Sequence, residues 1–233
     1  KYLDDVLTDI KFSNVAWNDD KGVFYKKNSN KEFFAKDSTY QLYYHKIGDI
    51  QSKDQLVFDT SNTKSNFSFF TKQNKLFIVE TSEDETTKNY YYSTIENESF
   101  QFKNFIKDDK SNLELLNIIN DKFYFSDEKY SWGNISYFDI NNRTENTILI
   151  PQVYSHLLVG ATFLENYIIC KYDNMGKYYM SIHDYTGKFI RKFEAPHNMD
   201  FQIRFYDEKT NELFVTFYSY TISSLNYKLN ITT

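Results

Sequence analysis

The side chains best suited to nucleophilic or acid–base chemistry in this 233-residue sequence are four histidines and one cysteine. A serine hydrolase holds its nucleophile on a strained Gly-x-Ser-x-Gly turn, and the six glycines form no such motif. None of the histidines has a serine and an acid at the spacing of a known catalytic motif. We interpret all four as structural or surface residues: His45, His156, His183 and His197. The sequence therefore predicts no catalytic residue in this chain.

Metal binding and carboxylate chemistry are not indicated either. The sequence has no His-Glu-x-x-His, Cys-x-x-Cys or calcium-loop pattern, so we expect neither a metal ion nor another cofactor. The acidic residues cluster at adjacent positions, whereas a glycosidase takes its two carboxylates from separate elements. We interpret these clusters as solvated turns: Asp4-Asp5, Asp19-Asp20, Glu83-Asp84-Glu85 and Asp108-Asp109.

Charge and hydropathy indicate which binding partners are not expected and which cellular compartment the protein occupies. The net charge is −5 and no basic stretch exceeds two residues, so nucleic acid and an anionic membrane surface are not expected partners. No apolar run approaches the 18 residues of a membrane span, and no signal peptide opens the sequence. Cys170 is the single cysteine and cannot form an internal disulfide. These features together predict a cytoplasmic protein.

A repeated pair of strand-like runs must position whatever function the chain has. The first run of the first pair covers residues 22–25 and the second covers residues 42–45, and similar pairs follow four more times. The second runs end near Ile47, Ile95, Ile140, Tyr185 and Leu229, which gives steps of 48, 45, 45 and 44 residues. A period of 40 to 50 residues made only of strands is typical of β-propeller blades. Each blade is a four-stranded sheet that packs against its neighbours around an axis.

The period divides the chain into one all-β domain, residues 1–233, of about five blades. Within each period we expect four strands with the innermost first, and residues 10–17 are the clearest inner strand. Outer strands are predicted at residues 55–58, 100–102, 147–150 and 189–193, and none follows Leu229. The predicted blades cover residues 1–60, 61–107, 108–151, 152–196 and 197–233.

The first 55 residues resemble one family closely. Lys11-Phe12-Ser13, followed by Ala16-Trp17, Phe24-Tyr25 and Leu42-Tyr43-Tyr44-His45, is similar to the propeller domain of prolyl oligopeptidases. The resemblance implies an incomplete propeller, the last five of seven blades, in front of an α/β-hydrolase domain that carries the catalytic serine, aspartate and histidine. It also implies a cytosolic serine endopeptidase that cuts short peptides after proline, with the propeller gating access to the active site.

One residue of the chain takes a substrate-binding role from this resemblance. The phenylalanine of the Lys-Phe-Ser stretch contributes to the apolar wall of the substrate pocket in the family, and here it is Phe12, although a core position on an inner strand is an equal alternative. Residues 80–88 occupy the place of a loop that supplies an arginine and a cysteine in the family, and they contain neither. Residues 65–69 replace a stretch that supplies a methionine.

Two other functions remain open at this point. A propeller that keeps the scaffold without the peptidase would serve as a non-catalytic protein-interaction module, since one fold hosts many functions. A five-bladed propeller that processes glycosides would need carboxylates on several inner strands, and only Glu114 and Asp200 lie near such positions.

Overall fold

The computed structural model describes residues 5–8, 10, 13–28, 40–96, 98–111 and 113–232. These residues are strands and loops apart from two short 3-10 helices, η1 (Gln51–Lys53) and η2 (Pro196–Asn198), which confirms the all-β prediction. The chain divides into two compact units, Lys1–Lys110 and Ser111–Thr233.

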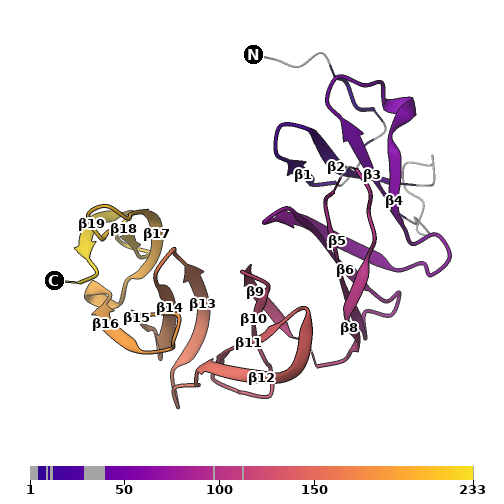
Figure 1. Ribbon diagram of the computed structural model, residues 1–233. Coiled ribbons are helices and arrows are strands. Elements are labelled where there is room, and N and C mark those ends of the chain that lie inside the picture. Colours follow the sequence, from indigo (N-terminus) through magenta and orange to yellow (C-terminus); the bar gives the residue numbers. More distant parts are fainter. Residues whose placement is uncertain are drawn as a thin grey trace. The chain divides into compact units, whose positions relative to one another are not determined.

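The first unit contains two antiparallel sheets of four strands, each with its strands in chain order (Figure 1). The first sheet consists of β1 (Val15–Asn18), β2 (Gly22–Asn28), β3 (Tyr40–Lys46) and β4 (Gln55–Asp59). The second sheet consists of β5 (Asn66–Lys72), β6 (Lys75–Thr81), β7 (Lys88–Thr94) and β8 (Lys103–Asp109).

The second unit contains two further sheets of four strands and one of three among the described residues (Figure 1). The third sheet consists of β9 (Glu114–Ile119), β10 (Lys122–Ser126), β11 (Ile135–Asp139) and β12 (Asn142–Ile150). The fourth consists of β13 (Leu157–Phe163), β14 (Ile168–Asn174), β15 (Lys177–His183) and β16 (Phe189–Glu194). The fifth consists of β17 (Asp200–Asp207), β18 (Glu212–Tyr218) and β19 (Leu225–Asn230).

The tight turns explain how a sequence with six glycines makes so many hairpins. Asn74 between β5 and β6, Asp121 between β9 and β10, and Asn211 between β17 and β18 all have positive φ angles, of 56°, 61° and 54°. Asparagine and aspartate tolerate this left-handed conformation better than other residues with a side chain. Asparagine and aspartate therefore occupy the positive-φ turn positions that glycine often occupies in other hairpins.

The hydrophobic core lies between consecutive sheets of the same unit. The fourth sheet shows this most clearly, because successive side chains of a strand point to opposite faces. Ile168 and Cys170 of β14 belong to a cluster with residues of the third sheet. Ile169 between them belongs to a cluster with residues of the fifth sheet. A sheet that is buried on both faces in this way matches the expectation for a blade between two others.

Two predicted strands are wrong in position. Residues 100–102 are not an outer strand, because Phe100 and Phe102 pack against the core of the first unit and β8 pairs with β7 only from Lys103 onward. The inner strand predicted at residues 10–17 begins at Val15, because the backbone N–H of Lys26 is bonded to the Ser13 hydroxyl instead of to the strand ladder. Lys11 and Phe12 lie outside the described residues.

Candidate functional site

The candidate site is the end of the first two sheets at which β1 and β5 begin. Phe12, the predicted substrate contact, lies outside the described residues, and the chain that follows it is held by side-chain hydrogen bonds. The Ser13 hydroxyl accepts a hydrogen bond of 2.7 Å from the Lys26 backbone N–H. The Asn14 side-chain amide donates to the carbonyl of Phe69 at 3.1 Å. These bonds attach the chain immediately after Phe12 to both β2 and β5.

A buried cation occupies the space between the two sheets at this end. Only 8% of Lys26 is exposed, and its ammonium group donates to the Asn66 side-chain oxygen at 3.1 Å and to the Phe67 carbonyl at 3.0 Å. The ammonium nitrogen also lies 4.3 Å from the ring centroid of Tyr40 and 5.1 Å from that of Phe67. Burial lowers the pKa of Lys26. The side chain thus joins β2 to the first residues of β5.

A buried carboxylate, that of Glu80, lies on β6, the strand next to β5 in the second sheet. Glu80 is 8% exposed and accepts hydrogen bonds from the hydroxyls of Ser65 at 2.5 Å, Thr63 at 3.3 Å and Tyr91 at 2.8 Å. Glu80 is also the ladder partner of Phe67, whose carbonyl accepts from Lys26. A buried cation and a buried carboxylate are therefore arranged around the same strand residue, each satisfied by polar partners.

The loop beyond Glu80 is organised by its own side chains. The Asp84 carboxylate accepts from the Ser82 hydroxyl at 2.6 Å and from the Thr86 hydroxyl at 2.9 Å. These hydrogen bonds lower the pKa of Asp84. Residues 65–69 and 80–88, which the sequence analysis singled out as departures from the family, are thus brought together on β5, β6 and the following loop.

The burial of Lys26 and Glu80 was not predicted from the sequence. The available signal was a charged residue directly after a run of strand residues, as in Val23-Phe24-Tyr25-Lys26 and Phe77-Ile78-Val79-Glu80. Such a charge is usually interpreted as the exposed end of a strand. Its burial depends on the neighbouring sheet, which the pattern of one strand does not reveal.

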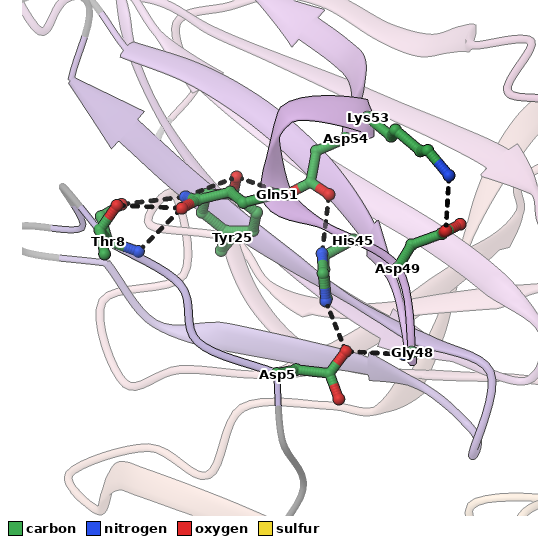
Figure 2. A network of polar contacts seen from close by, with 9 residues as sticks. All are labelled: Asp5, Thr8, Tyr25, His45, Gly48, Asp49, Gln51, Lys53 and Asp54. Carbon is green, nitrogen blue, oxygen red and sulfur yellow. Dashed lines mark hydrogen bonds and ion pairs between the residues drawn. The ribbon is translucent and has the colours of Figure 1, made fainter.

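Three of the histidines have defined polar partners. His156 Nδ1 lies 2.8 Å from the Tyr179 hydroxyl, and His183 Nε2 lies 2.7 Å from the Ser181 hydroxyl. His45 lies between two carboxylates, those of Asp5 and Asp54, in a network on the first sheet (Figure 2). Across the described residues, no three or more histidine, cysteine, aspartate and glutamate side chains are grouped so that they could hold a metal ion. The described helices are also too short to cross a membrane.

The comparison with protein families decides what kind of domain this is. All of the chain, residues 1–233, matches the family model for the N-terminal β-propeller domain of prolyl oligopeptidase. The chain belongs to the prolyl oligopeptidase family, as its propeller domain. The resemblance inferred from the Lys-Phe-Ser and Leu-Tyr-Tyr-His stretches is therefore confirmed, together with the β-propeller fold.

Individual relatives of this propeller domain agree with that assignment. The prolyl endopeptidases of Elizabethkingia meningoseptica and Elizabethkingia miricola are each 24% identical to the chain, over 100% and 99% of its length. The structure of prolyl oligopeptidase B from Galerina marginata, bound to a 35mer hydrolysis and macrocyclization substrate, aligns over 99% of the chain with a TM-score of 0.80 and 15% identity. A post-proline cleaving enzyme from Rickettsia typhi aligns over 94% of the chain with a TM-score of 0.71 and 13% identity.

The chain is much shorter than these relatives. It spans 34% of the length of both curated prolyl endopeptidases and 34% of the Galerina marginata chain. The alternative of a free-standing interaction scaffold is not favoured by these comparisons.

Proposed function

We propose that this propeller gates access of short, proline-containing peptides to a C-terminal α/β-hydrolase domain of a prolyl oligopeptidase-like serine endopeptidase. The observation that carries the proposal is the family match over residues 1–233, combined with coverage of about a third of two prolyl endopeptidases. The hydrolase domain would cleave the peptide bond. This chain would supply part of the wall and the entrance of the substrate cavity. Sites of this kind commonly form between domains.

Phe12 is the residue that we propose for contact with the substrate. Its support is positional, because Ser13 and Asn14 hold the following chain against β2 and β5 at the end where Lys26 and Glu80 are buried. An apolar ring at that point would pack against the proline-containing part of a peptide. Residues 80–88 and 65–69 replace stretches to which the resemblance assigns further pocket residues, so we expect the peptide preference of this protein to differ from that of its relatives.

The division of labour between domains can be tested directly. The 233-residue chain and the full-length gene product are assayed with a fluorogenic peptide that contains proline. We expect turnover by the full-length protein and none by the propeller alone. Turnover by the propeller alone would show that the chemistry resides in this chain. A full-length protein without activity on any proline-containing peptide would contradict the peptidase assignment.

Gating is tested by substrate size in the same full-length protein. We expect cleavage of a short proline-containing peptide and resistance of the same sequence placed in an exposed loop of a folded protein. Equal cleavage of both substrates would show that the propeller does not restrict access.

The role of Phe12 is tested with a matched pair of aromatic substitutions in the full-length protein. We expect Phe12→Ala to lower kcat/KM for the peptide roughly tenfold, because an apolar pocket contact is lost. Phe189→Ala is the control, since Phe189 is 55% exposed on β16 and is expected to leave kcat/KM unchanged. An unchanged kcat/KM in a folded Phe12→Ala protein would assign Phe12 to the core instead.

A further inference from the structure

His45 is a buried imidazole with a carboxylate on each side. It lies near the end of β3, opposite Val23 of β2, and only 1% of it is exposed. Its Nδ1 atom lies 2.7 Å from Asp54 Oδ1, and its Nε2 atom lies 3.1 Å from Asp5 Oδ1 (Figure 2). Both ring nitrogens are therefore directed at atoms that, in an ionised carboxylate, can only accept hydrogen bonds.

This geometry determines the protonation state that suits the site. A neutral imidazole carries one N–H and one lone pair, so it can satisfy one carboxylate and must present its lone pair to the other. An imidazolium carries two N–H groups and can donate to Asp5 and Asp54 at once, as two charge-assisted hydrogen bonds. The observed arrangement is complete only when His45 is protonated.

Asp5 belongs to a short segment that is attached to the first sheet by side chains. In addition to His45, Asp5 Oδ1 accepts from the backbone N–H of Gly48 at 2.6 Å. The Thr8 backbone N–H and hydroxyl each donate to Gln51 Oε1 at 3.0 Å, and Gln51 Nε2 donates back to the Thr8 carbonyl at 3.0 Å (Figure 2). Residues 5–8 form no strand with the sheet, so these contacts hold them in place.

The other ionisable groups around His45 do not replace its charge. Tyr25 on β2 donates its hydroxyl to Asp54 Oδ2 at 2.7 Å, and burial raises the pKa of Tyr25, which keeps it a neutral donor. The two lysines nearest to His45 in the sequence are paired with other carboxylates: Lys46 with Glu98 at 2.7 Å and Lys53 with Asp49 at 3.2 Å.

The electrostatics agree with the hydrogen-bond count. Burial by itself would lower the pKa of His45, but the hydrogen bonds to Asp54 and Asp5 outweigh it and raise the pKa above the ordinary 6.5. The pKa of Asp5 is lowered by the Gly48 N–H and by His45. Both shifts favour the charged forms of the pair.

We propose that protonated His45 is a pH-sensitive clasp that holds residues 5–8 against the first sheet and loosens Asp5 when the imidazole loses its proton. Asp5 is the partner that is released, because the contact with Asp54 is shorter and the Asp54 side chain is 3% exposed, against 12% for Asp5. The remaining N–H therefore stays on Nδ1, and the Nε2 lone pair faces the Asp5 carboxylate. The clasp is present below pH 6.5 and is lost as the pH rises through the folded-state pKa of His45.

The test measures the two backbone amides that report the clasp and the titration of His45 itself. Hydrogen exchange of Gly48 and Thr8 and the imidazole resonances are followed by NMR on the 233-residue chain from pH 5.5 to 8.5, with exchange corrected for its intrinsic pH dependence. We expect His45 to titrate above 6.5 and protection of the Gly48 amide to fall roughly tenfold over that transition, with a smaller fall at Thr8.

Two variants separate the clasp from general loosening. In His45→Gln the protection of Gly48 is expected to be low and independent of pH, whereas His183→Gln, a change at the same position of the fourth sheet, keeps the wild-type dependence. Asp5→Asn keeps the shape of the side chain and should lower the pKa of His45, and it serves if His45→Gln does not fold. Titration of His45 at or below pH 6.5 would overturn the proposal. So would the same pH dependence of protection in Asp5→Asn or His45→Gln as in the wild type.

Discussion

The first and fourth sheets carry a histidine at the same position, but they shift its pKa in opposite directions. His45 on β3 lies opposite Val23 on β2, and His183 on β15 lies opposite Ile168 on β14. Both imidazoles are buried. Two carboxylates raise the pKa of His45 against the effect of burial. For His183, burial prevails and lowers the pKa, with the Ser181 hydroxyl and the Gly187 carbonyl as neutral partners.

The difference comes from what covers that face of each sheet. In the fourth sheet the face is packed against the third sheet, since Ile168 shares a cluster with Leu149 and a Cβ atom at Gly187 would collide with the Leu149 carbonyl. In the first sheet the face receives Asp5 from residues 5–8. A repeat thus sets which positions are buried, while the covering segment sets the charge that a buried group carries.

The largest effect is expected from removing the carboxylate that His45 and Tyr25 share. Asp54→Ala leaves a buried imidazolium and a buried hydroxyl without their short partner, and should lower the free energy of unfolding by about 3 kcal/mol. Ser181→Ala removes only a neutral partner of His183 and should cost about 1 kcal/mol. Urea unfolding of both variants measures the two losses. Equal losses would show that the two histidines are held alike.

A second pair of residues repeats the comparison with lysine. Lys26 and Lys171 occupy equivalent positions on β2 and β14, and each donates to the carbonyl of the first aromatic residue on the next inner strand, Phe67 or Phe201. Both ammonium groups also lie over two aromatic rings. Lys171 forms an ion pair with Asp200 and is a quarter exposed, whereas Lys26 is buried and donates to neutral oxygens.

Truncation of these lysines should therefore have unequal costs. Lys26→Ala is expected to lower the free energy of unfolding by about 2 kcal/mol, because the buried Phe67 carbonyl loses its side-chain donor, Asn66 Oδ1 keeps only the Phe67 N–H, and two rings lose a packing partner. Lys171→Ala should cost less than about 1 kcal/mol, as is usual for a partly exposed ion pair. Lys26→Met is the matched control, since it restores much of the packing but cannot donate to either oxygen. A Lys26→Met protein as stable as the wild type would assign the effect to packing alone.

These pairs also show how far the sequence could predict the molecule. The 45-residue period predicted the sheets, because it depends on contacts within each hairpin. The family was predicted from the resemblance of the Lys-Phe-Ser and Leu-Tyr-Tyr-His stretches. The outer strand of the second sheet was misplaced, since Phe100 and Phe102 alternate as in a strand but pack into the core from a loop. The contacts of Lys26 with Asn66 and of His45 with Asp5 could not be predicted, because each joins side chains 40 residues apart in the sequence.

The most specific consequence is that pH should act with opposite sign on the two sheets. His45, whose pKa is raised, adds stability that is fully present below pH 6.5 and is lost as the pH rises through its folded-state pKa. His183, whose pKa is lowered, adds stability that is present above pH 6.5 and is lost as the pH falls through its folded-state pKa.

Substitution of each histidine separates the two effects. The free energy of unfolding is measured for the wild type, His45→Gln and His183→Gln between pH 5.5 and 8.5. The stability lost in His45→Gln should shrink as the pH rises, and the stability lost in His183→Gln should grow, because only the first histidine binds its proton more tightly in the folded protein. The effect is smaller than the truncations above, since the substitutions leave both carboxylates in place and a single proton is involved. Losses that change in the same direction with pH would show that the pKa values of His45 and His183 are shifted in the same direction. Covering the histidine with Asp5 in the first sheet, or with the third sheet in the fourth, would then not determine the sign of its contribution to stability.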